Sequence, residues 1–287
     1  MVGLSVAWLL LQRGHSVTLV DPCATGPQRA GAGSSAALGL LMAQVYRRSS
    51  GRGWRLRQRS HQLWGEWRQQ LSGRGHQLPW RPGLLQLAAD SQEALALQRL
   101  VEQRVQRGIA LQWLDRNALA ALQPTVPAAA QGGMLSPEDG QLDPLPMLGA
   151  LRADGLRLGL QLIAAAAVAL KRPTGVGGPW TLTLDDGQGL QAQWLVICGG
   201  LGSPALLEPL GHERPQAPVL GQALELQLPA GCPDPGGWPG SISWNGINLV
   251  PRANGRIWLG ATVEPDSDQA NAQALAGRIV ERGIDVV

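Results

Sequence analysis

The chain begins with M-V-G-L-S-V-A-W-L-L-L-Q-R-G-H-S-V-T-L-V-D-P, and the order of elements in this stretch restricts the fold more than any other feature. Apolar residues at helical spacing predict a helix over residues 4–13, which Gly14 ends. Residues 16–20 alternate in polarity and include β-branched side chains, so they predict a strand, and Asp21 follows directly. Helix, strand and carboxylate in this order are typical of the second half of a βαβ nucleotide-binding unit.

Gly3 and Asp21 fit the later positions of the dinucleotide-binding fingerprint. That fingerprint needs three glycines, and it places an acidic residue about 20 positions after them to bind ribose hydroxyls. If Gly3 is the third glycine, the first strand and the other two glycines would precede Met1. We therefore expect the chain to lack the first strand and the phosphate loop. Taken alone, the two residues are also compatible with an ordinary helix and a strand-end turn, since D-P commonly opens turns.

Composition narrows the class of protein. A chain of 287 residues with 44% hydrophobic content can bury a core in one large domain or two ordinary ones. A formal charge of only +3 does not indicate a nucleic-acid partner. The apolar stretches are shorter than the ~20 residues that span a bilayer, and the first lacks the basic region of a signal peptide. We expect no membrane span and no nucleic acid.

Cysteine and histidine usage indicates a reducing compartment without a metal site. The three cysteines are far apart and form no C-x-x-C pair, and the four histidines are scattered. An odd number of distant cysteines predicts neither a disulfide framework nor a zinc site. We therefore expect a cytoplasmic protein without a metal.

Periodicity and turn residues predict a mixed order of helices and strands in the remaining chain. The expected helices cover residues 56–71, 91–107, a short stretch after Asp115, a stretch that Asp143 caps, 203–210 and 271–280. The expected strands cover a stretch after Pro82 and residues 109–114, 160–163, 168–170, 180–184, 190–194, 195–200, 223–228, 247–250 and 257–261. The strand over 195–200 is predicted to be buried and to end in two glycines.

Six segments, taken in chain order, resemble the FAD-dependent amino-acid oxidase family, which contains D-amino acid oxidase, glycine oxidase and D-amino acid dehydrogenase. G-L-S-V-A-W-L-L-L-Q-R-G-H-S-V-T-L-V-D is similar to the family's first helix and second strand, and A-G-A-G-S-S-A-A-L-G-L-L to its flavin loop. D-G-Q-L-D-P-L-P-M-L-G-A-L is similar to the return to the nucleotide domain, and W-L-V-I-C-G-G-L-G-S-P-A-L-L to the second glycine-rich cofactor strand. A-P-V-L-G-Q is similar to the strand that leaves this cofactor strand, and I-N-L-V-P-R-A-N-G-R-I-W-L-G-A-T-V-E-P to the paired strands of the substrate domain.

The resemblance implies an α/β fold with an α+β insertion. A FAD-binding Rossmann-like domain, with its first strand missing, would be interleaved with an antiparallel-sheet substrate domain. The implied segments are residues 1–78 and 141–214 for the FAD-binding domain, and residues 79–140 and 215–287 for the substrate domain, the last also starting the return to the FAD domain.

The resemblance also implies a cofactor site for FAD. Gly3 and Asp21 would serve the ADP part, Asp21 through the ribose, and Val168 would contact adenine through its backbone. Four residues would line the pyrophosphate or flavin: Ser34, Ser35, Ala36 and Ala37. Gly199 and Gly200 would let the chain pass close to the cofactor. Arg252, in the V-P-R turn, would line the substrate cavity, although a surface arginine at a hairpin end is an equal alternative.

The implied reaction is the oxidation of the C–N bond of a small amino acid or amine by hydride transfer to the flavin, after which the imine hydrolyses. The flavin carries this chemistry, so no catalytic side chain is assigned. The family continues into a loop of the type G-x-R-P-x-T-x-D-G, whereas this chain ends at E-R-G-I-D-V-V, and it looks truncated at both ends. A non-catalytic remnant or binding module of the same fold stays open as the alternative, with an NAD-linked or RNA-binding protein more distant.

The stretch Y-R-R-S-S-G-R-G-W-R-L-R-Q-R-S is rich in arginine with interleaved aromatic residues. A phosphate-binding patch would use such residues. The amphipathic helix expected at residues 56–71 starts inside this stretch and needs a polar side, so a solvated helix face is the favoured interpretation.

Overall fold

The computed structural model describes residues 1–24, 33–231 and 234–260. The chain forms two compact units: unit 1 contains residues 1–35 and 145–218, and unit 2 contains residues 36–144 and 219–287. Each unit is therefore built from two separate stretches of sequence. The helix expected at residues 271–280 lies outside the described residues.

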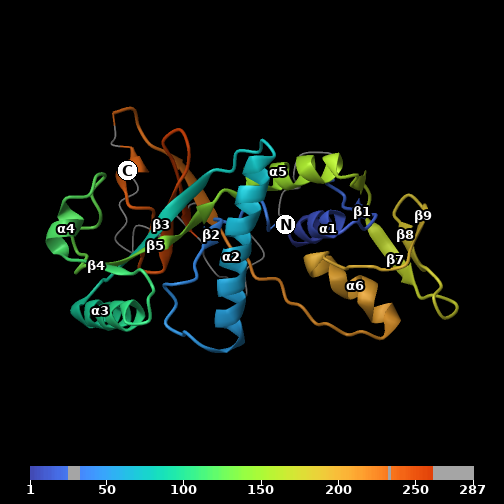
Figure 1. Cartoon of the computed structure of the whole chain (residues 1–287), viewed down its shortest axis with the longest axis horizontal. Coiled ribbons are helices and arrows are strands. Elements are labelled where there is room, and N and C mark those ends of the chain that lie inside the picture. The colour runs from blue at the N-terminus through green and yellow to red at the C-terminus, as the bar shows by residue number, and fades with distance from the viewer. Residues whose placement is uncertain (25–32, 232–233, 261–287) are drawn as a thin grey trace. The chain divides into compact units, whose positions relative to one another are not determined.

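Unit 1 contains helices on a short parallel sheet and a separate antiparallel sheet (Figure 1). Its helices are α1 (Val2–Gln12), α5 (Pro144–Arg157, which starts at the last residue of unit 2's first stretch), α6 (Ser203–Leu207) and the 3₁₀ turns η1 (Gly200–Gly202) and η2 (Glu208–Leu210). Its strands are β1 (Thr18–Val20), β6 (Gln161–Ile163), β7 (Ala167–Lys171), β8 (Trp180–Leu184) and β9 (Gly189–Ala192). Strand β1 pairs in parallel with β6, and β7, β8 and β9 form the antiparallel sheet.

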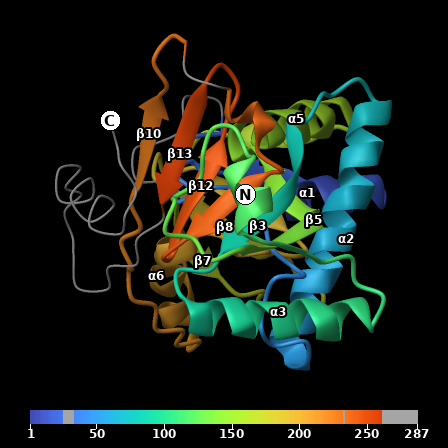
Figure 2. The ribbon, with the colours of Figure 1, turned by 90° about the vertical axis from the view of Figure 1, so that its left-hand side faces the viewer.

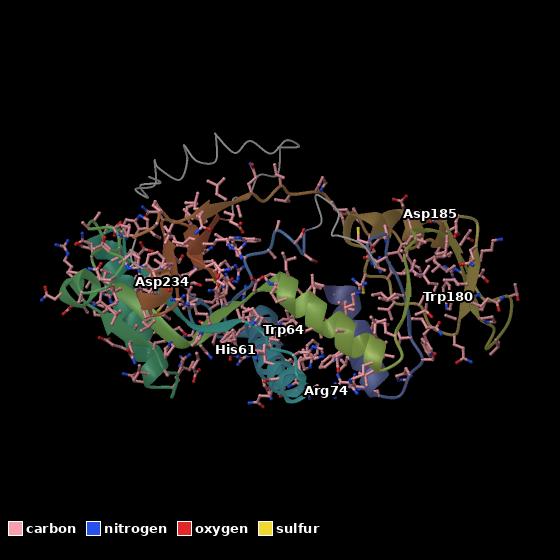
Figure 3. The ribbon with its side chains drawn as sticks, turned by 90° about the horizontal axis from the view of Figure 1, so that it is seen from above. His61, Trp64, Arg74, Trp180, Asp185 and Asp234 are labelled. Carbon is pink, nitrogen blue, oxygen red and sulfur yellow. The ribbon has the colours of Figure 1, made fainter. Side chains whose placement is uncertain are left out.

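The side-chain view marks both ends of one strand of this antiparallel sheet. Figure 3 labels Trp180, where β8 starts, and Asp185, in the turn that follows β8. The Asp185 carboxylate accepts a hydrogen bond from the Ala166 backbone N–H at 3.1 Å, so this turn is tied to the start of β7. The hairpin predicted from D-D-G-Q-G is the one observed.

The core of unit 1 holds α1 against the β1–β6 pair. Ala7, Leu11 and Leu160 are buried together, with Leu4 and Leu19 among the apolar residues packed against them. The apolar spacing that predicted the helix therefore provides its buried face. Beside this cluster, the fully buried indole of Trp8 donates to Asp154 on α5, and the Nε1–Oδ2 distance is 2.7 Å.

Replacing Asp154 with Ala is expected to lower the unfolding free energy of unit 1 by about 2–3 kcal/mol, because it leaves the buried Trp8 N–H without this acceptor. Arg157 also binds Asp154, at 2.9 Å, but its side chain is 57% exposed. Arg157→Ala should therefore cost less than Asp154→Ala, because water can reach the place of the exposed guanidinium and Asp154 keeps the Trp8 donor. Urea unfolding of both variants measures the difference, and equal losses would contradict the importance of the indole contact.

Unit 2 is organised around an eight-stranded mixed sheet with the order β10-β13-β12-β11-β3-β5-β2, and with β4 also paired to β5. The strands are β2 (Leu40–Leu41), β3 (Trp80–Leu87), β4 (Gln112–Leu114), β5 (Gly133–Leu142), β10 (Ala223–Gln227), β11 (Ser241–Trp244), β12 (Ile247–Pro251) and β13 (Arg256–Gly260). Its helices are α2 (Gly51–Gly73), α3 (Ser91–Val105), α4 (Arg116–Ala120) and the 3₁₀ turn η3 (Pro235–Gly237).

Strand β3 lies in the middle of this sheet with both faces covered. Its neighbours Leu84 and Leu85 are fully buried but belong to two different core clusters, because successive side chains of a strand point to opposite faces. Leu97 and Val101 of α3 cover the Leu84 face. Figure 2 shows α3 across one end of the sheet, with β10, β13 and β12 side by side. The two-sided burial explains why β3 contains consecutive leucines.

Local capping residues start two helices of unit 2, α3 and α4, where the sequence predicted them, whereas α2 starts at Gly51, before the predicted residue 56, without a side-chain cap. Asp90 caps α3 by accepting from the Glu93 N–H at 2.7 Å, and the Glu93 carboxylate accepts from the Ala89 N–H. Asp115 caps α4 by accepting from the Ala118 N–H at 2.8 Å. Side chains that satisfy the free N–H groups of a first turn fix where a helix begins.

The units differ from the predicted segments at residues 141–144, which lie in unit 2, at residues 215–218, which lie in unit 1, and most at residues 36–78, which lie in unit 2 and were predicted to join the FAD-binding domain. The reason is strand pairing, since β2 pairs with β5 at Leu40↔Gln141.

Figure 3 labels His61 and Trp64, both on α2 of this unit. Among the described helices, none combines the length and the apolar character needed to cross a membrane.

Candidate functional site

The start of α1 lies near two of the predicted cofactor residues of unit 1, Asp21 and Ser34, and near Cys198, which was not predicted. The Met1 amino group donates to Ser34 Oγ at 3.1 Å. Burial lowers the pKa of this amino group, and the nearby Asp21 and Cys198 oppose that effect. Asp21, Ser34 and Cys198 therefore all lie close to the first residue of the helix.

Gly3 lies in the first turn of α1 against the segment that contains Cys198. A Cβ atom added at Gly3 would lie 3.3 Å from Cys198 Cβ, which is tighter than an ordinary contact. The missing side chain thus allows the 195–200 segment to pass close to the helix, which is the role of a glycine in the fingerprint that packs helix on chain.

Asp21 directly follows β1, and its side chain is exposed. Its backbone N–H donates to the Ile163 carbonyl at 3.1 Å, so the β1–β6 pairing extends to this residue. The carboxylate accepts from the Cys23 N–H at 2.7 Å, which leaves further acceptor capacity on an exposed group. An exposed carboxylate at the end of this strand is placed as a ribose-binding residue would be.

The 195–200 segment differs from its prediction. We predicted a buried strand, but the structure has irregular chain without strand pairing up to Gly199, and Val196 is 60% exposed. A parallel strand needs a hydrogen-bonded neighbour, and none of the described strands pairs with this segment. Gly199 and Gly200 follow at the surface, and Gly200 has a φ of +56° at the start of η1, a conformation that suits glycine.

Val168 lies on β7 and is 53% exposed. The pairing of β7 with β8 shifts register between Ala167 and Ala169, so Val168 is the residue at the irregularity. A bulged residue leaves its backbone groups out of the ladder. This arrangement suits the predicted backbone contact to adenine, which stays a prediction.

These residues of unit 1 fit the ADP part of a dinucleotide. No side chain caps the N-terminus of α1, and no acidic residue lies in its first turn, so its free N–H groups and dipole favour an anion there. Asp21 adds an exposed carboxylate, a group that accepts hydrogen bonds from hydroxyls. Ser35, which adjoins Ser34, is half-buried in the same unit.

The other two residues of the predicted flavin loop, Ala36 and Ala37, lie in unit 2, the first exposed and the second half-buried. The chain after them is fixed to β5. The Leu142 N–H donates to the Gly39 carbonyl at 2.9 Å, and a Cβ added at Gly39 would lie 2.1 Å from the Leu142 carbonyl oxygen. Gly39 has a φ of +71°, so both space and backbone conformation call for glycine here.

A buried carboxylate fixes the far end of the same loop. Asp139 is fully buried on β5 and accepts hydrogen bonds of 2.6 to 3.1 Å from three consecutive backbone N–H groups, those of Ala43, Gln44 and Val45. The sequence pattern did not mark Asp139 as a site residue, because D-G after S-P-E is typical of a turn. The available signal was an acidic residue inside an otherwise paired strand.

Arg252 lies at the end of β12, and it is not a surface residue. Its side chain is only 5% exposed and donates to the Leu38 carbonyl at 2.8 Å and to Gln141 Oε1 at 3.2 Å. Burial lowers the pKa of its guanidinium, and Asp143, 4.0 Å away, opposes that effect. The alternative of a solvated hairpin end is therefore wrong, whereas the substrate contact stays a prediction.

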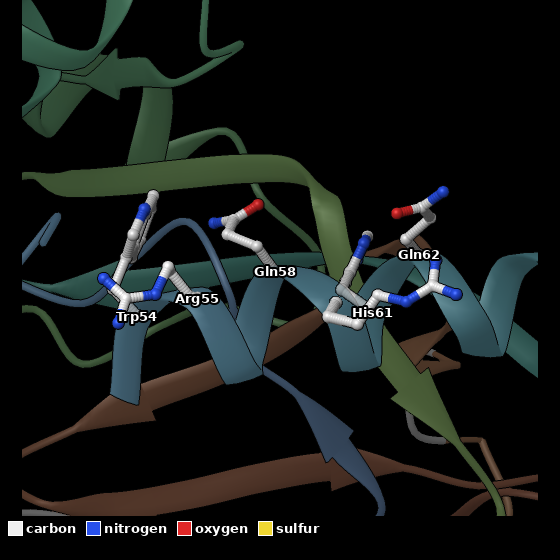
Figure 4. A pocket seen from close by; sticks show the side chains of 6 residues that line it. Trp54, Arg55, Gln58, His61 and Gln62 are labelled. Atoms are coloured by element: carbon white, nitrogen blue, oxygen red, sulfur yellow. The ribbon is translucent and has the colours of Figure 1, made fainter. Parts of the chain in front are cut away.

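A hollow of about 450 Å³ lies on the surface of α2 and is lined by Trp54, Arg55, Gln58, Arg59, His61 and Gln62 (Figure 4). All six come from one helix, so the hollow is not an enclosed substrate cavity. Within the arginine-rich stretch, Arg57 stacks on the Tyr46 ring at 3.7 Å, and Arg104 of α3 stacks on Trp54 at 4.5 Å. Such stacking supports the interpretation of this stretch as a packed and solvated helix face.

The described ranges contain no group of three or more His, Cys, Asp or Glu side chains that could hold a metal ion. Cys23 and Cys198 are free thiols, the second exposed.

Comparison with known proteins gives one family. The family model described as "DAO: FAD dependent oxidoreductase" matches residues 1–286. A Bifunctional protein ThiO/ThiG from Synechocystis sp. is 32% identical over 176 residues, covering 58% of this chain and 25% of that protein. A D-amino acid dehydrogenase from Rhizobium johnstonii is 30% identical over 154 residues, covering 51% of this chain and 35% of that protein. The chain thus spans about a quarter to a third of these two relatives.

Solved structures show the same fold. Glycine oxidase from Geobacillus kaustophilus aligns with a TM-score of 0.80 and 23% identity, over 97% of this chain and 74% of that one. Iminodiacetate oxidase from Chelativorans sp. BNC1 aligns with a TM-score of 0.81 and 20% identity, over 98% and 75%. The predicted fold class is confirmed.

Proposed function

The chain belongs to the DAO family of FAD-dependent oxidoreductases, and from this premise we propose that it oxidises the C–N bond of a small amino acid or amine. FAD is the cofactor of this family. When bound, the flavin supplies the two-electron oxidation, and the protein binds, orients and shields the reactants. The observation that supports the proposal most directly is the convergence of Gly3, Asp21 and Ser34 at the uncapped start of α1.

Each residue of unit 1 has a proposed task toward FAD. The first-turn N–H groups of α1 would face a phosphate, and Gly3 would keep that approach free of a side chain. Asp21 would accept hydrogen bonds from the ribose hydroxyls. Ser34 and Ser35 would donate to the pyrophosphate, and Val168 would contact adenine through its backbone. Gly199 and Gly200 would leave room for the cofactor at the surface of the 195–200 segment.

The substrate is the less constrained part of the proposal. The relatives carry names that refer to glycine, D-amino acids and iminodiacetate, which are small molecules with an amine and a carboxylate. We propose a substrate of this class and assign no catalytic side chain. A cytoplasmic location stays a prediction, supported by the free Cys23 and Cys198 thiols.

The cofactor test is a titration of the purified protein with FAD. Bound flavin gives a visible absorption spectrum and changes its fluorescence, and the variant Asp21→Ala should bind FAD about tenfold more weakly, because it loses charge-assisted hydrogen bonds to the ribose. Glu213→Ala is the matched control, since Glu213 is an exposed acid of the same unit with no side-chain contact recorded among the described residues.

Two outcomes would count against the proposal. A folded wild-type protein that takes up no flavin at millimolar FAD would support the non-catalytic alternative. Equal FAD affinity of the Asp21 variant and the wild type would remove the ribose role of Asp21 while leaving the family assignment in place.

A further inference from the structure

Arg252 joins three parts of unit 2 that are far apart in the sequence. It follows β12, its Nη2 atom donates to the Leu38 carbonyl at 2.8 Å, and its Nη1 atom donates to Gln141 Oε1 on β5 at 3.2 Å. Its Cζ atom lies 5.0 Å from the centre of the Trp258 ring on β13. One guanidinium thus connects the flavin-loop segment, the central sheet and the β12–β13 hairpin.

The shape of the guanidinium suits this connection. Arg presents a rigid, planar fork of donors, so it can bind two acceptors in fixed directions at once, whereas the ammonium of Lys is a point charge without that geometry. Gln141, the second acceptor, is itself held because its amide donates to the Pro251 carbonyl. The Gln141 acceptor on β5 is therefore held in position independently of the Leu38 loop.

Leu38, whose carbonyl accepts the hydrogen bond from Arg252, directly follows Ala36 and Ala37 in the sequence. From Leu38 onward the chain is fixed by the Leu142–Gly39 hydrogen bond and by the pairing of β2 with β5. The Leu38 carbonyl is therefore the first fixed point after the predicted flavin-contacting residues. If the Leu38 carbonyl lost Arg252 as its donor, the stretch of chain that no hydrogen bond holds would extend further beyond Ala37.

A buried charge is costly unless it is paired and hydrogen-bonded, so Arg252 would not be retained at 5% exposure without internal acceptors. Asp143 lies 4.0 Å from Nη1 and supplies a partial counter-charge. Leu38 and Gln141 each accept from a different Nη nitrogen, whereas the buried Nε has no hydrogen-bond partner among the described residues. The guanidinium is therefore held by internal acceptors, whatever else its remaining N–H groups bind.

We propose that Arg252 is a positioning residue, which acts through the Leu38 carbonyl to hold the loop of Ala36 and Ala37 in the conformation that receives the flavin. The part that concerns flavin rests on the proposed function. The part that concerns the loop is a property of the chain alone.

The first test uses the protein without FAD and follows hydrogen exchange. In Arg252→Met, amides of residues 37–41 should exchange at least about tenfold faster, since the loop loses a charge-assisted hydrogen bond. Arg252→Lys should give nearly the same acceleration, because Lys cannot bind both acceptors. The amides of β12 and β13 should keep their protection in both variants. Arg256→Met, four residues away with an exposed side chain paired to Glu225, should leave all of these rates unchanged.

Two exchange results would overturn the loop role. Unchanged exchange over residues 37–41 in Arg252→Met would show that the residue does not hold the loop. An equal loss of protection in β12, β13 and the loop would show that Arg252 only stabilises the sheet.

The second test separates flavin from substrate. Arg252→Met should weaken FAD binding about tenfold with little change in the substrate KM at saturating FAD, because the affected loop contacts the cofactor. A raised KM with unchanged FAD affinity would show a substrate-binding residue and would overturn the proposal. If the wild type binds no flavin, the proposed function fails, and the exchange experiment still decides whether Arg252 holds the loop.

Discussion

Gly83→Ala is expected to prevent unit 2 from folding, or to lower its unfolding free energy by more than about 4 kcal/mol. Gly83 has a φ of +96°, and a Cβ atom added to it would lie 1.7 Å from the Pro239 carbonyl oxygen. The Pro239 oxygen belongs to the backbone, and the position of a Cβ does not depend on a rotamer, so no rotamer change can relieve the clash. The substitution combines an unfavourable conformation with an overlap at the centre of the sheet.

The overlap arises where β3 and β11 approach each other. These strands pair in parallel, and a Cβ added to Gly240 would in turn lie 2.0 Å from the Gly83 carbonyl oxygen. Two facing glycines therefore permit the contact that joins residues 36–144 to the second stretch of unit 2. Separating the strands would break the ladder that links the two stretches of sequence.

Gly65→Ala on α2 is the matched control. Nothing lies within 4 Å of a Cβ atom added at Gly65, and the residue is inside a helix, so Ala should stabilise the protein by about 0.5–1 kcal/mol. Soluble yield, circular dichroism and urea unfolding of the two variants are compared. A folded Gly83→Ala protein with wild-type stability would show that the β3–β11 contact is not as close as described.

Local signals predicted most helices and several strands. The capping residues Asp90 and Asp115 act over three or four positions, so a short window of sequence contains the whole interaction. The same is true of α1, β1 and Asp21 at the start of the chain. The candidate nucleotide-site residues Gly3 and Asp21 could be predicted because their spacing follows from a local helix–strand unit.

Remote pairing explains what the sequence could not predict. Strand β2 has only two residues and exists because β5 pairs with it. Strand β11 precedes an Asn245–Gly246 turn, a hairpin signal that was missed, and its parallel partner β3 is distant in the sequence. The 195–200 segment shows the converse: an apolar run predicts a strand, but strand pairing depends on a neighbour that local sequence does not specify.

The position of Arg252 in unit 2 depends on contacts with residues that are remote in the sequence as well. Arg252 was predicted to line the substrate cavity from its place in a hairpin, yet its burial comes from Leu38 and Gln141. The two acceptors are a backbone carbonyl and a side-chain amide, and neither has a pattern that marks it as an arginine partner. Sequence spacing shows which hydrogen-bond donors Arg252 carries. The order of the strands in the sheet decides which acceptors lie next to it.

Asp139→Ala is expected to lower the unfolding free energy of unit 2 by about 3–5 kcal/mol, because three buried N–H groups lose their acceptor together. Ala43, Gln44 and Val45 are each less than a tenth exposed, so water cannot easily replace the carboxylate. Asp139→Asn should cost about 2 kcal/mol, since one oxygen remains and the amide nitrogen faces a donor. Urea unfolding at neutral pH gives both values.

The neighbour Glu138 supplies the control. It is exposed, and Glu138→Gln removes the same charge from the same turn, so it should change the unfolding free energy by no more than about 0.5 kcal/mol. In β5 this turn is an insertion opposite Gly83, since Ser136 pairs with Leu84 and Gly140 with Pro82. The inserted residues aim the Asp139 carboxylate at the loop that follows Ala36 and Ala37. If both substitutions cost the same, net charge would explain the loss. A large loss for Asp139 alone would show that its carboxylate fixes one end of that loop, as Arg252 is proposed to fix the other.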